Sequence, residues 1–381
     1  MKICYVTTVP ITLSAFVLPV VRHIHEQTDW EICMICDDDP EFAKLLPQGV
    51  RYIPVSMKRG ISLGGIGAML KMRKIFRQEK FDLVQYSTPN ASLYASLAAK
   101  LAKVPARLYC QWGIAYVGFS GLKRKIFKAV EKLVCSCSTQ VEPDSFGNLN
   151  FSHAQGLYPE NKGRVIWNGS ASGVNLTKFD ITQKDAWRQE IRSRYGVEED
   201  AFVYGFVGRI PRDKGIDELF AAYPKLLAEK ENTYLMMVGS LENEQLLDQQ
   251  LYRWATENDR VIFCGQTREV EKYMSAMDVY ILPSYREGFG SAVVEAEAMG
   301  VPVIVSDIPG PTDAMLPEKT GIVVKKADVQ TLYEAMIRMV EDRQMCCRMS
   351  REAFRFASER FEQRELAQRI LEDRKDLMNI T

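Results

Sequence analysis

The chain has 381 residues, 46% of them apolar, so it exceeds what one hydrophobic core usually organises and two domains are expected. Lysine plus arginine and aspartate plus glutamate number 49 each, which argues against a general nucleic-acid-binding protein. The charge is uneven, however, because residues 1–180 hold 22 basic and 14 acidic side chains, and most of this excess lies between Arg51 and Lys132. An anionic surface or substrate is therefore expected for the first half.

The chain contains nine cysteines and three histidines, and we interpret the cysteines as buried thiols of a reduced, cytosolic protein. Cys33 and Cys36 lie in a β-like run, and no second pair follows at zinc-finger spacing. Residues 1–21 place a lysine before an apolar stretch, as a secretory signal does, but Pro10 interrupts the stretch and no small-residue cleavage pattern follows. A first strand and a first helix are therefore expected there. No apolar run reaches the roughly 18 to 20 residues needed to cross a bilayer.

Short β-rich runs alternate with amphipathic helical stretches in the first half, such as residues 66–80 and 91–104. The predicted strands lie at 2–9, 31–37, 50–56, 81–87, 106–112 and 135–143. Strands separated by helices form parallel sheets, so this half is expected to be a doubly wound, Rossmann-like α/β domain.

A second series of strands predicts a second doubly wound domain. These strands are expected at 202–210, 233–240, 260–265, 278–284 and 302–307. A strand-like run at 164–168 gives way to glycine, serine and asparagine before a charged helix, so we place the junction near residue 180. The predicted domains are therefore 1–180 and 181–361. A charged amphipathic helix at about 362–381 is expected to pack back on the first domain.

Residues 206–215 carry polar groups suited to a ligand. They are predicted to form a strand that stops at Gly208, followed by a loop that presents Arg209 and Lys214. Ligands bind at the carboxyl ends of the strands in doubly wound sheets, and two cations at such an end suit a diphosphate. An ordinary solvated basic turn is the alternative.

Residues 286–302 join a predicted loop to a predicted helix. Ser291 is expected to be the N-cap of this helix, which should end at Gly300. The glycines at 288 and 290 let backbone amides approach a ligand, and the N-terminus of a helix attracts phosphate. The segment is therefore a second candidate for phosphate binding.

The same segment holds Glu287 and Glu295. If it were helical throughout, a rise of 1.5 Å per residue would separate their carboxylates by about 12 Å, more than the roughly 5 to 10 Å of a glycosidase acid/base pair. The two glutamates are better interpreted as holding the two ends of one ligand. A nucleotide sugar has a suitable length, with sugar hydroxyls at one end, ribose hydroxyls at the other and the diphosphate over the helix start. The alternative is that both are ordinary exposed acids.

Together these segments resemble the donor half of the retaining GT-B glycosyltransferases of family GT4. The resemblance rests on GRIPRDKGIDELF at 208–220, VGS at 238–240, the run from FCGQ at 263 to TDAM at 315, and TGIVV at 320–324. It includes the two glutamates eight positions apart and covers about residues 165–345. The stretch GVNLTKF at 173–179 resembles the hinge segment of that family.

Carried over by position, the resemblance implies that Glu287 holds the transferred sugar, while Arg209 and Lys214 stabilise the diphosphate. Glu295 would hold the ribose, and Gly265 with Gln266 would lie near the base. The donor-binding residues that it implies are Gly208, Gly265, Gln266, Gly288, Phe289, Gly290, Ser291, Ala292 and Glu295. The donor is expected to be a UDP-sugar, and no metal ion or other cofactor is expected. The acidic triplet at 37–39 is a tempting metal site, but a solvated loop is expected there.

The first half departs from the family pattern. Many relatives have a glycine pair after the first strand, where this chain reads TTVPITLS at 7–14, and often a histidine where it reads CQWG at 110–113. Gln111 and Trp112 are the candidate substitutes for that histidine on the acceptor side. The glycine-rich run at 63–69 lacks the preceding strand and following acid of a dinucleotide site, so a loop and a helix start are expected.

The basic amphipathic stretches at 68–80 and 121–133 are either solvated faces or attach the protein to anionic lipid headgroups, and we favour attachment, with Ile126 and Phe127 inserted shallowly. Bacterial enzymes that resemble this chain commonly extend a sugar on an undecaprenyl diphosphate carrier. The resemblance therefore implies a retaining, metal-independent transferase that moves a hexose or N-acetylhexosamine from a UDP-sugar to a lipid-linked saccharide. Such an enzyme would be peripheral on the cytoplasmic face of the inner membrane. A non-catalytic nucleotide-sugar-binding subunit and a UDP-sugar epimerase are the alternatives.

Overall fold

The computed structural model describes residues 1–57 and 63–379, so part of the basic region between Arg51 and Lys132 lies outside the described residues. The chain divides into two compact units, unit 1 (Met1–Gly173 with Gln363–Thr381) and unit 2 (Val174–Glu362). The first boundary lies before the expected junction near 180. The reason is that Val174 donates its backbone N–H to the Phe361 carbonyl at 2.7 Å, and Phe179 is buried in the core of unit 2.

Unit 1 contains a parallel sheet of six strands in the order β3-β2-β1-β4-β5-β6. The strands are β1 (Lys2–Val6), β2 (Glu31–Cys36), β3 (Arg51–Pro54), β4 (Leu83–Tyr86), β5 (Ala106–Gln111) and β6 (Gln140–Pro143). In β1, Ile3 and Tyr5 belong to one hydrophobic cluster while Cys4 and Val6 belong to another, because successive side chains of a strand point to opposite faces. Both faces of the sheet are therefore buried, as is usual for parallel sheets.

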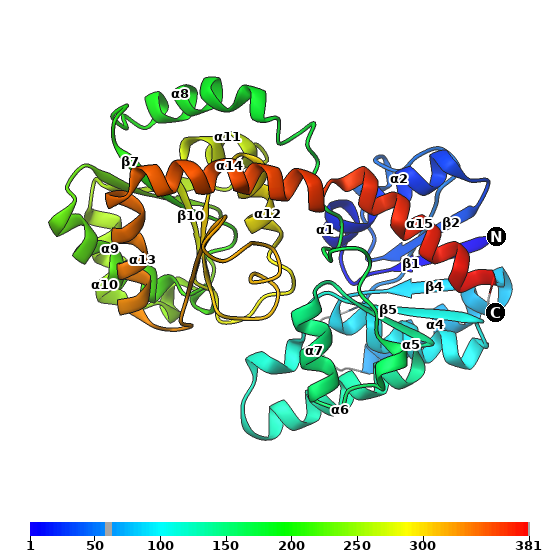
Figure 1. The fold of residues 1–381 in the computed structure, drawn as a ribbon. Coiled ribbons are helices and arrows are strands. Elements are labelled where there is room, and N and C mark those ends of the chain that lie inside the picture. Colours follow the sequence, from blue (N-terminus) through cyan, green and yellow to red (C-terminus); the bar gives the residue numbers. More distant parts are fainter. Residues whose placement is uncertain (58–62, 380–381) are drawn as a thin grey trace. The chain divides into compact units, whose positions relative to one another are not determined.

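Helices cover both faces of this sheet (Figure 1). Helices α2 (Leu18–Gln27) and α15 (Gln363–Asn379) pack on one face, and α4 (Leu63–Glu79), α5 (Pro89–Ala102) and α6 (Gly121–Cys137) pack on the other. The other helices are α1 (Pro10–Thr12), the π-helix Leu13–Val17, α3 (Pro40–Ala43) and α7 (Phe146–Ala154). The C-terminal helix thus belongs to unit 1, although the chain reaches it only after completing unit 2.

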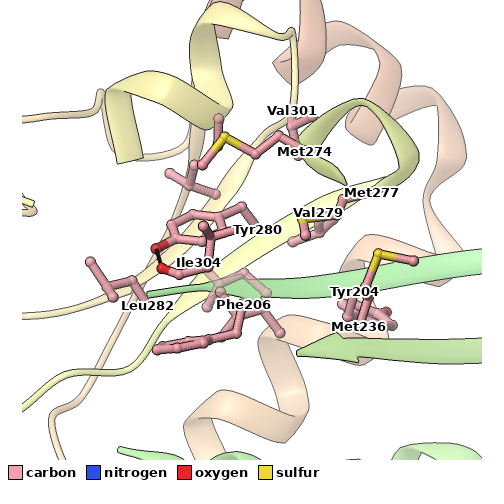
Figure 2. Packing of buried hydrophobic residues seen from close by; sticks show 14 of the residues in the cluster. Tyr204, Phe206, Met236, Met274, Met277, Val279, Tyr280, Leu282, Val301 and Ile304 are labelled. Carbon is pink, nitrogen blue, oxygen red and sulfur yellow. Dashed lines mark hydrogen bonds between the residues drawn. The ribbon is translucent and has the colours of Figure 1, made fainter. Parts of the chain in front are cut away.

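Unit 2 contains a second parallel sheet, in the order β12-β11-β10-β7-β8-β9. The strands are β7 (Phe202–Val207), β8 (Thr233–Val238), β9 (Val261–Gly265), β10 (Val279–Leu282), β11 (Val303–Ser306) and β12 (Gly321–Val324). The helices are α8 (Lys184–Arg194), α9 (Ile216–Glu229), α10 (Gln249–Glu257), α11 (Val270–Ala276), α12 (Ser291–Ala298), α13 (Val329–Glu341) and α14 (Arg343–Arg360). Figure 2 shows part of the core, where Phe206, Tyr280 and Ile304 lie together. The predicted α/β class with two doubly wound sheets is confirmed.

Three local expectations were wrong. Residues 164–168 form no strand, because the chain turns where Trp167 adopts a φ of +51° and the Gly169 N–H bonds to the Ile166 carbonyl. The predicted strand 135–143 begins only at Gln140, since Cys135 and Cys137 are the last buried residues of α6. Cys347 is exposed, whereas the other cysteines are buried or half-buried, and all of them are free thiols.

Among residues 1–57 and 63–379, no helix has both the length and the apolar content that crossing a bilayer requires.

Candidate functional site

Two loops of unit 2 meet because their parent strands are neighbours in the sheet. Strands β7 and β10 pair directly, so the loops at their carboxyl ends lie on the same edge. The first loop leads to a 3₁₀ turn at Arg212–Lys214 and the second spans residues 283–290. The Tyr285 N–H bonds to the Asp213 carbonyl at 2.9 Å, and Arg286 pairs with the Asp213 carboxylate at 2.9 Å. These contacts fix the two loops to each other.

The centre of this site is an ion pair between Lys214 and Glu287. The Lys214 Nζ lies 2.5 Å from Glu287 Oε1, and the Ser284 hydroxyl donates to the same oxygen at 2.6 Å. The Glu287 side chain is only 12% exposed, and Ser284 is completely buried. The structure therefore brings together two residues that the sequence predicted for the site. Ser284, which orients the carboxylate, was missed, although it is the last residue of the predicted strand 278–284.

The loop before α12 presents backbone rather than side chains. Gly290, with a φ of +85°, is the N-cap of α12, and Ser291 is the first helical residue rather than the expected cap. The Phe289 side chain is buried against Phe361, with ring centroids 5.3 Å apart, so only its backbone is available to a ligand. The N-terminus of α12 presents backbone amides and a partial positive charge, which suit a phosphate group.

Glycine is needed where the loops after β7 and β10 contact the neighbouring loops, which follow β8 and β11. A Cβ at Gly310 would lie 1.7 Å from the Gly288 carbonyl oxygen, and one at Gly239 would lie 1.8 Å from the Gly208 carbonyl oxygen. Gly208 itself has a φ of +146°. Gly239 and Gly310 were not predicted as site residues. Gly239 lies at the end of the predicted strand 233–240, and Gly310 follows the predicted strand 302–307, so these positions were the available signal.

Arg209 does not contact the Lys214–Glu287 pair in this structure. Its Nη1 lies 2.6 Å from Glu242 Oε2, and its side chain is 65% exposed. An exposed ion pair of this kind contributes little, so Arg209 can exchange Glu242 for a bound anion at small cost.

Three further residues predicted to bind the donor lie on α12 or at the end of β9. Glu295 is on α12, where burial raises its pKa, Lys178 opposes this shift and Glu271 adds to it. Gly265 ends β9 and accepts the Gly239 N–H at 2.8 Å, while Gln266 is exposed. Strand β9 is the edge strand next to β8, so Gly239 connects Gly265 with the central loops.

On the acceptor side, the geometry argues against a sugar contact by Gln111. This side chain has 0% exposure, and its Nε2 donates to Glu131 Oε1 at 2.5 Å. Its Oε1 accepts from Ser152 at 2.9 Å and from Tyr158 at 3.3 Å, so both polar atoms of the amide are hydrogen-bonded inside unit 1. Burial raises the pKa of Glu131, and the hydrogen bond from Gln111 opposes this shift. Gln111 therefore stabilises the core beneath the strand end.

Trp112 stays a prediction as an acceptor contact. It is half-buried, and its ring centroid lies 5.7 Å from that of Phe16, which belongs to the π-helix after β1. The run at 7–14, which replaces the family's glycine pair, is held by a hydrogen bond of 2.7 Å between the Thr8 and Thr88 hydroxyls. Hydroxyl and aromatic groups thus stand at the positions where the resemblance led us to expect glycine and histidine.

The acidic triplet and the glycine-rich run have structural roles. Asp39 caps α3, and Asp37 accepts the Met57 N–H at 2.8 Å. Within the part of the chain that the structure describes, no group of three histidine, cysteine, aspartate or glutamate side chains could hold a metal ion. The run at 63–69 forms the first turns of α4, where Gly65 packs so closely on Tyr94 that a Cβ would overlap the ring.

Comparisons with known proteins agree with this architecture. Residues 188–356 match the family model of glycosyl transferases group 1, and residues 2–145 match that of glycosyl transferase 4-like proteins. The chain is 30% identical over 314 residues to the capsular polysaccharide biosynthesis glycosyltransferase CapM of Staphylococcus aureus, covering 82% of this chain and 81% of CapM. It is 27% identical over 328 residues, with the same coverage, to an Escherichia coli enzyme named UDP-Gal:alpha-D-GlcNAc-diphosphoundecaprenol alpha-1,3-galactosyltransferase.

Among solved structures, the Anabaena protein HepE in complex with UDP and glucose superposes with a TM-score of 0.80. The match covers 99% of this chain and all of HepE at 21% identity, a level at which it supports the fold alone. The two family models, the extended similarity to CapM and the shared two-domain fold have one consequence: the chain belongs to the GT4 family of GT-B glycosyltransferases.

Proposed function

We propose that this glycosyltransferase moves a hexose or N-acetylhexosamine, with retention of configuration, from a UDP-sugar to a saccharide linked to undecaprenyl diphosphate. The observation that carries the donor assignment is the Lys214–Glu287 pair beside the amide-rich start of α12. A cation, a fixed carboxylate and backbone amides suited to phosphate thus lie within two adjoining loops, which supports the proposal. The acceptor assignment rests on the names of the relatives, which include capsule enzymes and enzymes acting on diphosphoundecaprenol-linked sugars. A role in surface polysaccharide assembly follows.

In the proposed mechanism, the acceptor hydroxyl attacks the anomeric carbon from the face that the diphosphate leaves. The new glycosidic bond forms as the bond from the anomeric carbon to the phosphate oxygen breaks, and a departing phosphate oxygen takes the acceptor proton. Lys214, Arg209 and the amides of residues 288–292 stabilise the charge that develops on the diphosphate, so the proposal needs no metal ion. Glu287 holds the hydroxyls of the transferred sugar.

The proposal is tested by incubating the protein with a panel of UDP-sugars and lipid-linked saccharides without added metal ions. A glycosylated lipid with released UDP is the expected product. An unchanged donor would favour a non-catalytic binding subunit, and an isomerised donor would favour an epimerase. Product formation that requires a divalent cation would contradict the metal-independent mechanism.

The two glutamates should differ in their effect on UDP itself. Glu295→Ala is expected to weaken UDP about tenfold, because the carboxylate would no longer accept the ribose hydroxyls. Glu287→Ala should change UDP affinity less than about twofold, because UDP lacks the transferred sugar. Calorimetric titration with UDP measures both values, and an equal loss in the two variants would contradict the division of roles.

The proposed site of action is the cytoplasmic face of the membrane, reached through α6. Leu122, Ile126 and Leu133 lie along one side of this helix and are 73%, 48% and 41% exposed. Basic side chains surround this stripe, and such a pattern is typical of helices that lie at an anionic lipid surface. Phe127, which was expected to insert, packs instead on Phe119 with ring centroids 4.7 Å apart, because it lies on the inner side of the helix.

Reversing Lys123, Arg124, Lys125 and Lys128 to glutamate is expected to abolish co-sedimentation with anionic vesicles at low salt and to leave UDP affinity unchanged. Each basic residue near the surface contributes about 1 kcal/mol. The wild type should be released as the Debye length falls from roughly 30 Å at 0.01 M to 3 Å at 1 M salt. A matched control reverses four exposed bases of unit 2, Lys319, Arg348, Arg351 and Arg355, and should still sediment. If the wild type does not co-sediment with such vesicles at any salt concentration, a soluble acceptor is favoured.

A further inference from the structure

The carboxyl ends of β1, β4 and β5 bring three loops of unit 1 together. These strands are neighbours in the sheet, and the direction in which the chain adds strands reverses between β1 and β4. Ligands of doubly wound sheets bind at the carboxyl ends of the strands where such a reversal occurs. The residues proposed to bind the donor belong to unit 2, so this end of the unit 1 sheet is left for another ligand.

The loops at this end carry no charged side chain. Residues 3–21, 83–99 and 108–122 run from the three strands through the loops into the next helices, and they include no aspartate, glutamate, lysine or arginine. These four residue types make up 26% of the whole chain. Hydroxyl side chains stand in the loops instead, at 7–8 and 87–88. Diphosphates and nucleotides are bound through cations, so the ligand suited to this place is polar but neutral.

Two aromatic rings lie against each other at the same end of the sheet. Phe16 belongs to the π-helix Leu13–Val17 after β1, and Trp112 is the residue that directly follows β5. Their ring centroids are 5.7 Å apart, and their planes are inclined by 49°. Both residues are half-buried, so part of this aromatic pair is accessible to a ligand. π-Helical turns are rare and frequently mark functional sites.

Backbone and hydroxyl contacts fix the loops that carry these rings. The Trp112 N–H bonds to the Cys110 carbonyl at 3.1 Å, which turns the chain directly after β5. The Thr8 N–H donates to Thr88 Oγ1 at 3.1 Å, and the two hydroxyls are 2.7 Å apart, so the loops after β1 and β4 hold each other. Thr88 has a φ of +68°, which β-branched residues rarely adopt and which is typical of residues at ligand sites. The aromatic pair is therefore preformed.

We propose that Phe16 and Trp112 form a platform for one neutral pyranose ring of the acceptor saccharide. A pyranose has a face of C–H groups, which stacks on the electron-rich face of an aromatic ring, and a rim of hydroxyls, which suits uncharged hydroxyl side chains. A polyprenyl chain has no hydroxyls to offer them, and the diphosphate of a lipid carrier needs cations that these loops lack. The inference rests on the proposed function, because it takes the acceptor to be a lipid-linked saccharide.

The test compares undecaprenyl diphosphate that carries a neutral saccharide with undecaprenyl diphosphate alone, in detergent micelles, by equilibrium binding to the whole protein. The wild type is expected to bind at least one saccharide-bearing lipid of the panel about tenfold more tightly than the bare carrier. Trp112→Leu and Phe16→Leu keep an apolar side chain but remove the ring, so each should lower this preference about fivefold. Affinity for the bare carrier should change less than about twofold, which reports an intact unit 1.

Two further variants serve as controls. Trp112→Phe keeps an aromatic face and should retain most of the preference, which a merely structural role of the indole does not predict. Trp30→Leu should leave the preference unchanged. Trp30 is also half-buried and packs against the same hydrophobic cluster as Trp112, but it precedes β2 and so lies at the opposite end of the sheet.

The outcomes separate this inference from the proposed function. If the wild type binds every saccharide-bearing lipid no better than the bare carrier, or if the two leucine variants keep the full preference, the platform is wrong whether or not transfer occurs. If these variants weaken the bare carrier equally, the rings contact the lipid and not the sugar, which also overturns the platform. If the preference depends on both rings but no UDP-sugar is ever consumed, the platform stands and the proposed transfer reaction is wrong.

Discussion

Replacing Lys214 with alanine is expected to lower kcat/KM at least ~100-fold, equivalent to about 2.7 kcal/mol of transition-state stabilisation. Lys214 Nζ is fixed 2.5 Å from Oε1 of Glu287, the carboxylate proposed to hold the sugar, in the loop that leads to α12. A point charge at that place acts most strongly when the diphosphate departs. Arg209→Ala is expected to lose a similar factor, because its exposed pair with Glu242 leaves it able to turn to the ligand. Steady-state kinetics with the preferred UDP-sugar measures both.

The matched control is Arg212→Ala. Arg212 lies in the same 3₁₀ turn as Lys214, but its Nε pairs with Asp217 at 2.8 Å, away from Glu287. Its removal takes the same charge from the turn and should change kcat/KM less than about threefold. Near-wild-type turnover by Lys214→Ala would contradict the proposed diphosphate site. If all three variants lose kcat/KM equally, the loss comes from the changed net charge of the loops and not from a specific contact.

The largest expected effect on stability comes from Arg374→Met, which should lower the free energy of unfolding of unit 1 by about 3 to 5 kcal/mol. The Arg374 side chain on α15 is 1% exposed and binds both oxygens of Glu142 on β6, at 2.5 and 2.9 Å. It also donates to Gln85 on β4 at 3.1 Å and pairs with Asp373. Methionine fills much of the space but leaves Glu142 buried without its cation. Urea unfolding followed by hydrogen exchange in peptides of β4 and β6 reports unit 1 separately.

Two further variants identify the cause of that loss. Adding Glu142→Met to Arg374→Met removes the stranded charge and should restore most of the stability, because a buried ion pair exchanged for apolar residues is often neutral. Lys44→Met breaks an exposed pair of unit 1 with Glu41 and should cost less than about 1 kcal/mol. If the double variant is no more stable than Arg374→Met, the lost packing of the arginine stem explains the effect and the buried charge does not.

The two sheets could be predicted because each strand is a short apolar run and each covering helix has its own amphipathic pattern. These signals are local. The donor loops were also recognisable, since a strand, a glycine-containing loop and a helix start follow one another within about 15 residues from 279 to 293. The errors lie where local signals compete: Ser291 looks like an N-cap, but Gly290 adopts the positive φ that begins the helix.

The sequence by itself determined the α/β class, the two-sheet organisation and the candidate donor residues, because backbone periodicity and turn chemistry are encoded in neighbouring residues. Only the tertiary structure decided which side chains meet. Lys214 and Glu287 are 73 positions apart and pair because β7 and β10 are adjacent in the sheet. The same holds for Gln111. Helix α6 covers the end of its strand, so the Gln111 amide donates to Glu131, although the sequence alone predicted it as a sugar contact. Strand order and helix rotation fix such contacts, and both depend on how the whole domain buries its apolar surface.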